Sequence, residues 1–306
     1  MRLGIDPKVD YVFKRLFGSE ENALLLISLL NAVALPARPV TGVEIVLAHA
    51  DKASPEDKLA IGDVKARDQG NRQFHVEMQW QVPWFFPKRV LFYWSKFHPQ
   101  QLREGENYLT LRPTISRCFT NRTLYPGLED HHLVFRLREE KHGAAFSDDL
   151  EIHLVELPKF TKTAEQLTSA LDRWCYFLRH GEDLDPDRLP ASLDVPEIRR
   201  ALEVLTVFTQ DEREREIYEL RLKYQRDQSS LLQDAEERGI EKGVEKGIEK
   251  GIEKGLAKGA LVSKIQGFQE MLKQPPTPQA ELSALSQEDL AGLLAQLREQ
   301  LTANGS

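Results

Sequence analysis

A strict alternation of apolar and polar residues around position 77 constrains the fold of this chain more than any other feature. The apolar members are Phe74, Val76, Met78 and Trp80, and the polar members are His75, Glu77, Gln79 and Gln81. Successive side chains of a strand point to opposite faces, so the pattern predicts a strand with one apolar and one polar face. The segment before it, which contains Asp63 and Lys65, also predicts a strand. The polar run Asp68-Gln69-Gly70-Asn71-Arg72 between the two strands predicts the turn of a hairpin.

The polar face of this hairpin has the chemistry of a cation site. Asp63 and Lys65 share one face of the first strand, and Glu77 lies on the polar face of the second. If these faces coincide, Asp63 and Glu77 become candidate ligands of Mg²⁺, or of Mn²⁺, with the backbone carbonyl of Met78 as a third oxygen ligand. Gln79 would lie beside them. An ordinary hairpin with its polar face in water explains the same pattern, and spacing alone does not separate the two interpretations.

The bulk composition restricts the class of protein. The chain has 306 residues, enough for one large or two smaller domains, and its net charge of −7 argues against a generally basic nucleic-acid coat. Its two cysteines, Cys118 and Cys175, form no CxxC pattern, which argues against a zinc site or a disulfide framework. The longest apolar run, Ala23 to Leu35, is shorter than the roughly 20 residues that span a bilayer. We therefore expect a soluble, cytoplasmic protein without a membrane partner.

Three regions differ in their sequence patterns. Residues 1–225 predict an α/β or α+β domain, because helical periodicity near the start is followed by several strands and then by further helices. Residues 226–274 contain the four-residue repeat G-[IV]-E-K, from Gly239 to Gly259. Residues 275–306 begin with the break Pro275-Pro276-Thr277-Pro278 and predict a short helical tail with a leucine stripe.

The repeat predicts an unusual helix. A step of four residues advances about 40° beyond a full turn, so the apolar residues from Ile240 to Leu256 wind around the helix axis. Each interior glycine costs about 0.8–1 kcal/mol relative to alanine. We expect a labile helix that becomes firmer when it self-associates, and hence a homo-oligomer formed through this repeat.

The segment after the hairpin combines basic and aromatic residues. These residues are Lys88, Arg89, Lys96, Arg103, Arg112, Arg117 and Arg122, with Trp84, Phe85, Tyr93 and Trp94 between them. One interpretation is a surface that contacts phosphates and stacks on bases. The other places the aromatic residues in the core and leaves the basic residues in water.

Several motifs together resemble one family. They are D-x-x-F-K-x-x-F-G (Asp10 to Gly18), D-V-K-A-x-D (Asp63 to Asp68), V-E-M-Q (Val76 to Gln79), R-x-x-x-Y-W-S (Arg89 to Ser95) and Q-L-R-E-G-E-N-Y (Gln101 to Tyr108). With the glycine-glutamate repeat, they resemble the Rpn family of recombination-promoting nucleases and transposases, within the PD-(D/E)XK superfamily. The resemblance implies a restriction-endonuclease-like core, in which helices flank a central mixed sheet, followed by a C-terminal helical repeat tail. It also implies metal-dependent cleavage of DNA, for which we expect Mg²⁺.

The resemblance also implies roles for individual residues. Asp63 would be the first acid and Glu77 the second, while Gln79 takes the place of the usual lysine. Because glutamine carries no charge and cannot act as a general base, Lys65 would restore the positive charge. A further acid would come from Asp10 or Glu20.

Two hypotheses follow for the function. The first is a DNA endonuclease that promotes recombination. The second is a catalytically decayed DNA-binding scaffold that assembles through its tail.

Overall fold

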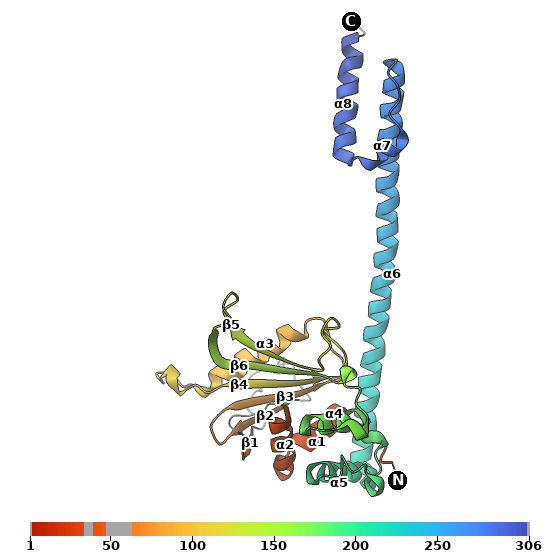
Figure 1. Ribbon diagram of the computed structural model, residues 1–306. Coiled ribbons are helices and arrows are strands. Elements are labelled where there is room, and N and C mark those ends of the chain that lie inside the picture. The colour runs from red at the N-terminus through yellow and green to blue at the C-terminus, as the bar shows by residue number, and fades with distance from the viewer. Residues whose placement is uncertain (1, 34–38, 47–62, 305–306) are drawn as a thin grey trace. The chain divides into compact units, whose positions relative to one another are not determined.

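The computed structural model describes residues 2–33, 39–46 and 63–304, which divide into two compact units between Ser229 and Ser230 (Figure 1). The first unit contains a six-stranded sheet with the strand order β1-β2-β3-β4-β6-β5. The β2–β3 and β1–β2 pairs are antiparallel, β4 is parallel to both β3 and β6, and β5 returns antiparallel on β6. The strands are β1 (Val43–Val46), β2 (Asp63–Asp68), β3 (Gln73–Gln79), β4 (Thr114–Thr120), β5 (His132–Arg138) and β6 (Ala145–Glu156).

Helices cover both faces of this sheet, which confirms the predicted α/β architecture with a mixed central sheet (Figure 1). One face, here called the core face, packs against four helices through residues such as Phe74, Val76 and Phe119. The other face, here called the α3 face, packs against α3 through Cys118 and Leu154. The helices of the core face are α1 (Asp10–Phe17), α2 (Ala23–Val33), α4 (Ala170–His180) and α5 (Pro196–Gln210), and α3 spans Phe86–Phe97.

Short 3₁₀ segments join these elements. They are η1 (Glu20–Asn22), η3 (His98–Gln101), η4 (Tyr108–Thr110), η5 (Leu157–Lys159), η6 (Ala164–Gln166), η7 (Gly181–Asp183) and η8 (Pro186–Arg188). The segment η3 follows α3 directly and has Pro99 as its second residue, where a proline ends the preceding helix.

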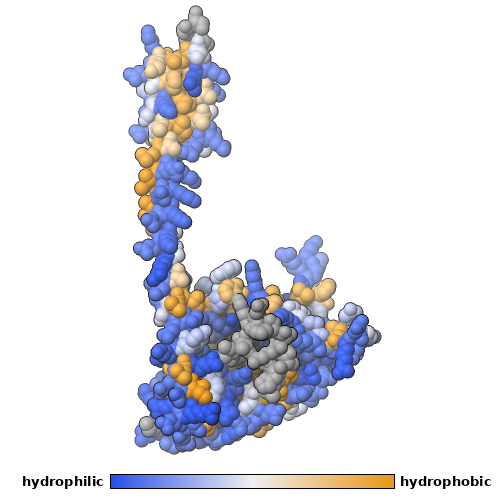
Figure 2. Space-filling model, turned by 180° about the vertical axis from the view of Figure 1, so that it is seen from behind, coloured by the Kyte–Doolittle hydropathy of each residue, from blue (hydrophilic) through white to orange (hydrophobic). Residues whose placement is uncertain are grey.

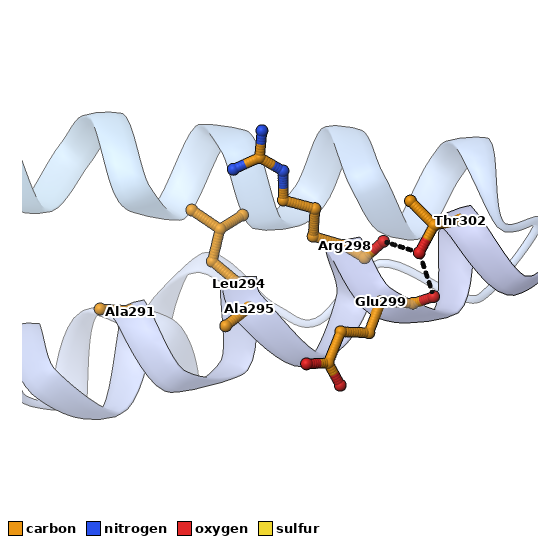
Figure 3. Close-up of a pocket in the computed structure, with 6 residues that line it drawn as sticks. All are labelled: Ala291, Leu294, Ala295, Arg298, Glu299 and Thr302. Carbon is orange, nitrogen blue, oxygen red and sulfur yellow. Dashed lines mark hydrogen bonds between the residues drawn. The ribbon is translucent and has the colours of Figure 1, made fainter.

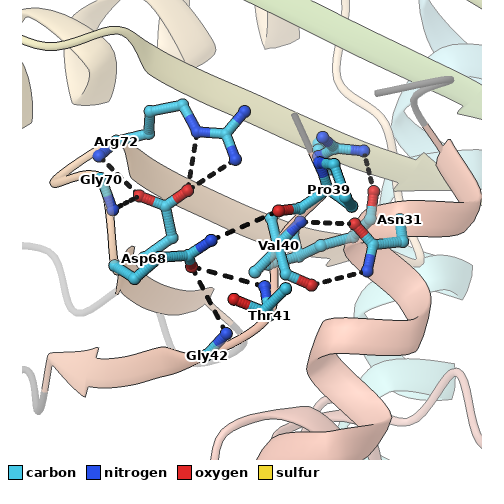
Figure 4. Close-up of polar contacts among 11 residues, drawn as sticks. Asn31, Pro39, Val40, Thr41, Gly42, Asp68, Gly70 and Arg72 are labelled. Atoms are coloured by element: carbon cyan, nitrogen blue, oxygen red, sulfur yellow. Dashed lines mark hydrogen bonds and ion pairs between the residues drawn. The ribbon is translucent and has the colours of Figure 1, made fainter. Parts of the chain in front are cut away.

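The register of the β2–β3 hairpin is fixed by one buried carboxylate (Figure 4). Asp68 accepts hydrogen bonds from the backbone N–H groups of Gly70 (2.9 Å) and Arg72 (2.8 Å), and it pairs with the Arg72 guanidinium at 2.6 Å. Asn71 adopts a left-handed φ of 60°, a conformation that asparagine tolerates in turns. These bonds close the turn predicted between the two strands, and a slipped register would break them.

A second polar clamp ties α2 to the start of β1 (Figure 4). The Asn31 side chain accepts from the backbone N–H of Val40 and donates to the Val40 carbonyl, both at 2.8 Å. Nearby, the Gln69 side chain donates to the Pro39 carbonyl at 3.3 Å. The hairpin turn is therefore linked to the core helices.

Helix α6 (Glu212–Met271) contains the four-residue repeat and runs through the division between the units. In the C-terminal unit its last turns pack against α7 (Gln279–Ala284) and α8 (Gln287–Asn304) through a small apolar cluster. The members of this cluster include Val262, Ile265, Leu282, Leu290 and Leu297.

The apolar residues of the repeat face solvent. Ile240, Val244, Ile248, Ile252 and Leu256 are 57–71% exposed, and apolar side chains are visible along this part of α6 in Figure 2. Within the C-terminal unit, a Cβ added at any of the repeat glycines would meet no atom within 4 Å. The described chain therefore gives these glycines no packing role of its own.

No described helix is both long enough and apolar enough to cross a membrane by itself. The bent pair formed by Asp10–Phe17 and Glu20–Val33 meets the length and composition criteria only when the two helices are taken together.

Candidate active site

The hairpin register brings the two predicted acids to adjacent strands. The Cα of Asp63 pairs with that of Glu77, and the Cα of Lys65 pairs with that of His75. Directly paired positions of an antiparallel ladder occupy the same face of the sheet. The side chain of Asp63 lies outside the described residues, so the observation concerns its strand position. The expected convergence of the two polar faces therefore holds at the level of the backbone.

The polar face of the hairpin is not open to water, which argues against the alternative of an ordinary hairpin with its polar face in water. His75 is 1% exposed and Glu77 is 2% exposed, because α3 lies over this face. Helix α3 is held there by Phe86 and Val90, which pack on the sheet, and by Trp94, whose indole N–H donates to the Thr114 carbonyl at 2.9 Å. An alternating pattern distinguishes the faces of a strand, but it does not reveal which element covers the polar one.

Arg89 on α3 joins the candidate site, although the sequence placed it only in the basic segment and in a family motif. Its guanidinium donates to the Glu77 carboxylate and to the side-chain oxygen of Gln79. The side chain of Arg89 is 28% exposed and that of Glu77 is 3% exposed, so a cation meets a buried acid at the margin of solvent. A buried carboxylate requires a positive partner, but the burial of Glu77 is not visible in the sequence. The signal that could have identified Arg89 is the R-x-x-x-Y-W-S motif that begins at this residue.

The Gln79 side chain connects this group to the chain beyond β3. Its amide donates to the backbone carbonyl of Gln81, while its oxygen accepts from Arg89. Gln79 thus holds an oriented amide beside Glu77. The positive charge that glutamine lacks is present in the same group, supplied by a helix rather than by the strand.

Lys65 lies elsewhere on the same face. It is half-buried, and its ammonium lies 5.4 Å from the ring centroid of Phe97, at the far end of α3 from Arg89. His75, its cross-strand partner, lies with its ring 6.0 Å from that of Tyr93. The structure therefore brings together Glu77, Gln79 and Arg89, and Lys65 belongs to the neighbouring part of the α3 face.

The family of PD-(D/E)XK nuclease family transposases matches residues 7–235 of the chain. The chain belongs to this family. No curated protein and no solved structure matches the chain. The match spans the sheet, the helices of both faces and the start of α6, so the resemblance found in the motifs is confirmed for the first unit. Asp63 and Glu77, the two acids that the motif resemblance implies, both lie on the β2–β3 hairpin. The catalytic role of each residue stays a prediction.

Neither candidate for a further acid is tied to Glu77 by a described contact. Asp10 accepts from the backbone N–H of Tyr11 at 2.7 Å and lies 3.9 Å from the Arg221 guanidinium. Burial raises the pKa of the Asp10 carboxyl. Glu20 is exposed at the start of η1. Among the described side chains, no group of three or more His, Cys, Asp or Glu residues is close enough to hold a metal ion.

The basic and aromatic segment divides between the two interpretations. Arg117 is 3% exposed and donates to the Leu30 carbonyl at 2.6 Å, and burial lowers its pKa to about 10. This arginine therefore belongs to the core. Trp84, in contrast, is 84% exposed and Phe92 is 53% exposed.

A shallow depression in the C-terminal unit has different chemistry. It is lined by six residues of α8 between Ala291 and Thr302 (Figure 3). The Thr302 hydroxyl bonds the backbone carbonyls of Arg298 and Glu299 at 3.3 and 2.7 Å. One carboxylate and one guanidinium on an open helix surface do not form a converging set of groups, so the sheet remains the candidate site.

Proposed function

We propose that this protein is a Mg²⁺-dependent DNA endonuclease that promotes recombination by hydrolysing phosphodiester bonds. Asp63 and Glu77 would hold the metal, and Mn²⁺ would support the reaction in place of Mg²⁺. The observation that supports this proposal best is the backbone pairing of Asp63 with Glu77, next to Gln79 and Arg89 in a member of a nuclease family.

The donor atoms at the corner of the sheet where β2 begins and β3 ends fit a hard divalent cation, which prefers oxygen ligands. Glu77 offers a carboxylate. The Gln79 carbonyl accepts from the backbone N–H of Asn121 at 3.0 Å, on the β4 side, so the preceding carbonyl of Met78 faces the β2 side. The described ladder between β2 and β3 ends at the pair of Asp63 and Glu77. A metal bound there would lower the pKa of a water molecule and offset the charge of the phosphate.

The protein side chains would position the substrate. Arg89 would donate to a non-bridging phosphate oxygen, which offers the paired acceptors that a guanidinium suits. Since a guanidinium does not lose its proton, Arg89 orients and neutralises but does not act as the base. The amide of Gln79 would orient the attacking water. Lys65 would add positive charge from the same face of the hairpin.

Plasmid nicking tests the proposal. Wild-type protein with Mg²⁺ should convert supercoiled plasmid to the open-circular form, and Asp63→Ala and Glu77→Ala should not. Glu44→Ala is a matched control, because this acid lies on the neighbouring strand β1 with its side chain 73% exposed. Circular dichroism verifies that each variant is folded. Equal nicking by wild type and both site variants would refute the proposal.

One observation favours a second candidate, a catalytically decayed DNA-binding scaffold. The guanidinium of Arg89 already neutralises Glu77 and engages Gln79. In a decayed site this arrangement would be permanent. Calorimetric titration with Mg²⁺ separates the two candidates, since the active enzyme should bind the ion in an Asp63-dependent manner. The scaffold should bind DNA and self-associate without any such heat.

We also propose that the repeat of α6 mediates homo-oligomerisation. The exposed apolar residues from Ile240 to Leu256 support this proposal. Deletion of residues 239–259 should lower the sedimentation coefficient by reducing the assembly state and leave the melting of the first unit unchanged. An assembly state unaffected by the deletion contradicts it.

A further inference from the structure

The outward face of α3 has a regular chemical pattern that the hairpin site does not use. Trp84, Lys88, Phe92 and Lys96 follow one another at four-residue intervals. Val90, which faces the sheet, is buried, whereas all four of these residues are exposed. Residues four apart lie on one side of a helix, so Lys88, Phe92 and Lys96 form a row, and Trp84 extends this row just before the helix begins. These four residues are here called the α3 row.

Each cation of the α3 row lies over an aromatic ring. The Lys88 ammonium is 5.5 Å from the ring centroid of Trp84, and the Lys96 ammonium is 4.8 Å from that of Phe92. Trp84 is nevertheless 84% exposed and Phe92 53% exposed. The row therefore presents two open ring surfaces, each with an ammonium within a few ångströms.

The charge of the surrounding segment is complementary to a polyanion. Between Val82 and Arg103 the sequence contains four basic residues and no acidic one, in a chain of net charge −7. A protein partner that packed on aliphatic surface would not require a cation at every ring. Alternating rings and ammonium groups match the alternating bases and phosphates of a nucleic acid strand.

The spacing favours a single strand over a duplex. Successive members of the row within α3 rise about 6 Å along the helix. Bases stacked in one strand of a duplex rise about 3.4 Å and hide their faces from stacking partners. Rings on the convex surface of a helix reach base faces only where the bases are unpaired.

We infer that the α3 row binds unpaired DNA bases and guides that strand toward Glu77. This inference rests on the proposed function for the identity of the polymer. The connection to the site is Arg89, which follows Lys88 in the sequence and whose guanidinium contacts Glu77. The preferred substrate is accordingly DNA that is single-stranded or frayed beside the cleavage point.

Binding without metal tests this inference separately from cleavage. Full-length protein in EDTA is titrated into a fluorescein-labelled oligothymidine and into a duplex of the same length, and anisotropy is recorded. Wild type should prefer the single strand. Trp84→Ala and Phe92→Ala should each weaken single-strand binding roughly 5- to 150-fold, the range measured for loss of one stacking residue. Leu109→Ala, at a position that is also 84% exposed but has no cation over it, should have no effect.

Two further measurements distinguish stacking from a structural role. Trp84→Phe should retain most of the affinity but lose the quenching of tryptophan fluorescence that accompanies binding. Lys88→Gln and Lys96→Gln should each reduce the slope of log affinity against log salt by about 0.7, the value for one phosphate contact on a single strand.

The inference is overturned by equal affinity for both DNA forms, or by unchanged binding in Trp84→Ala and Phe92→Ala. A change in sedimentation of these variants without a change in DNA binding would instead assign the row to a second copy of the chain, and would also overturn it. Nicking activity is read independently. If the protein nicks DNA without preferring single strands, the proposed nuclease function stands and the inference about the α3 row fails. If it binds single strands without nicking, the proposed nuclease function fails.

Discussion

Replacement of Arg89 by methionine tests whether the guanidinium stabilises a buried acid where a metal would also act. The Glu77 side chain is 3% exposed, and removal of one member of a buried ion pair costs about 3–5 kcal/mol. Because the Arg89 side chain is 28% exposed, we expect the lower end of this range, about 3 kcal/mol. For a unit of this size, 1 kcal/mol shifts the melting temperature by about 2–4 °C, so the expected loss is about 6–12 °C.

Mg²⁺ should partly reverse this loss. A ligand that binds only the folded state stabilises it by about 2.7 kcal/mol at one hundred times its Kd. In wild type the ion competes with the guanidinium for Glu77, whereas in Arg89→Met it does not. The variant should therefore gain more thermal stability from Mg²⁺ than wild type gains. The double variant Arg89→Met/Glu77→Gln should regain stability without metal and respond little to it.

Differential scanning calorimetry over a Mg²⁺ series measures these differences. Arg67→Met is a matched control, because Arg67 lies 3.9 Å from Glu44 on the same sheet and both side chains are exposed, at 39% and 73%. Exposed pairs contribute about 0–1 kcal/mol, so this control should melt near wild type and show no added response to Mg²⁺. The reasoning is refuted if Arg89→Met melts with wild type, or if Mg²⁺ stabilises all variants equally.

Three further changes probe the scaffold around the site. Gly18→Ala should destabilise the first unit by about 1–3 kcal/mol through overpacking, because the new Cβ would lie 2.8 Å from the Lys14 carbonyl oxygen and 3.2 Å from Val64. Urea unfolding measures this change in the free energy of unfolding. Asp68→Ala removes the acceptor that closes the hairpin turn and should cost about 1–3 kcal/mol by the same measurement, with a control at exposed Glu44. The melting temperature should fall as the pH falls from about 6.5 toward 4, because burial and neighbouring cations lower the pKa of His132 to about 4 and the unfolded state therefore binds this proton first. His132→Gln should flatten the dependence of melting temperature on pH, and an unchanged dependence would contradict the assignment.

The sequence predicted the hairpin because its determinants are local. The alternation around Glu77 and the turn residues from Asp68 to Arg72 act within a few residues of one another, and the observed register matches the expected pairing of Asp63 with Glu77. The mixed character of the sheet was implied by the family resemblance, whereas the order of helices and strands indicated only a domain that combines the two. These features depend on periodicity and turn chemistry, which are visible in a single chain.

The covering of the polar face was not predictable in the same way. Whether α3 would lie over Glu77 or over the opposite face depends on long-range packing, such as that of Phe86 and Val90 against Cys118 and Leu154. Arg89 was therefore read as one member of a basic segment, not as the partner of a buried acid. The same packing decided that Arg117 lies in the core while Trp84 lies in solvent.

The α3 row illustrates how the two interpretations of one segment combine. Residues of α3 that face the sheet, such as Val90, are apolar and buried, as expected for a core helix. Residues on the outward side retain the rings and cations that the other interpretation required. A helix can serve both purposes because its faces are independent, whereas the sequence presents them interleaved.

Diffraction from crystals soaked in Mn²⁺ tests the central claim most directly, because the anomalous signal locates the ion without reference to activity. The account predicts one strong peak at the corner where β2 begins and β3 ends, bonded to the carboxylates of Asp63 and Glu77, with the Arg89 guanidinium displaced from Glu77. A peak bonded to neither acid, or Arg89 still bound to Glu77 at saturating Mn²⁺, would contradict the account.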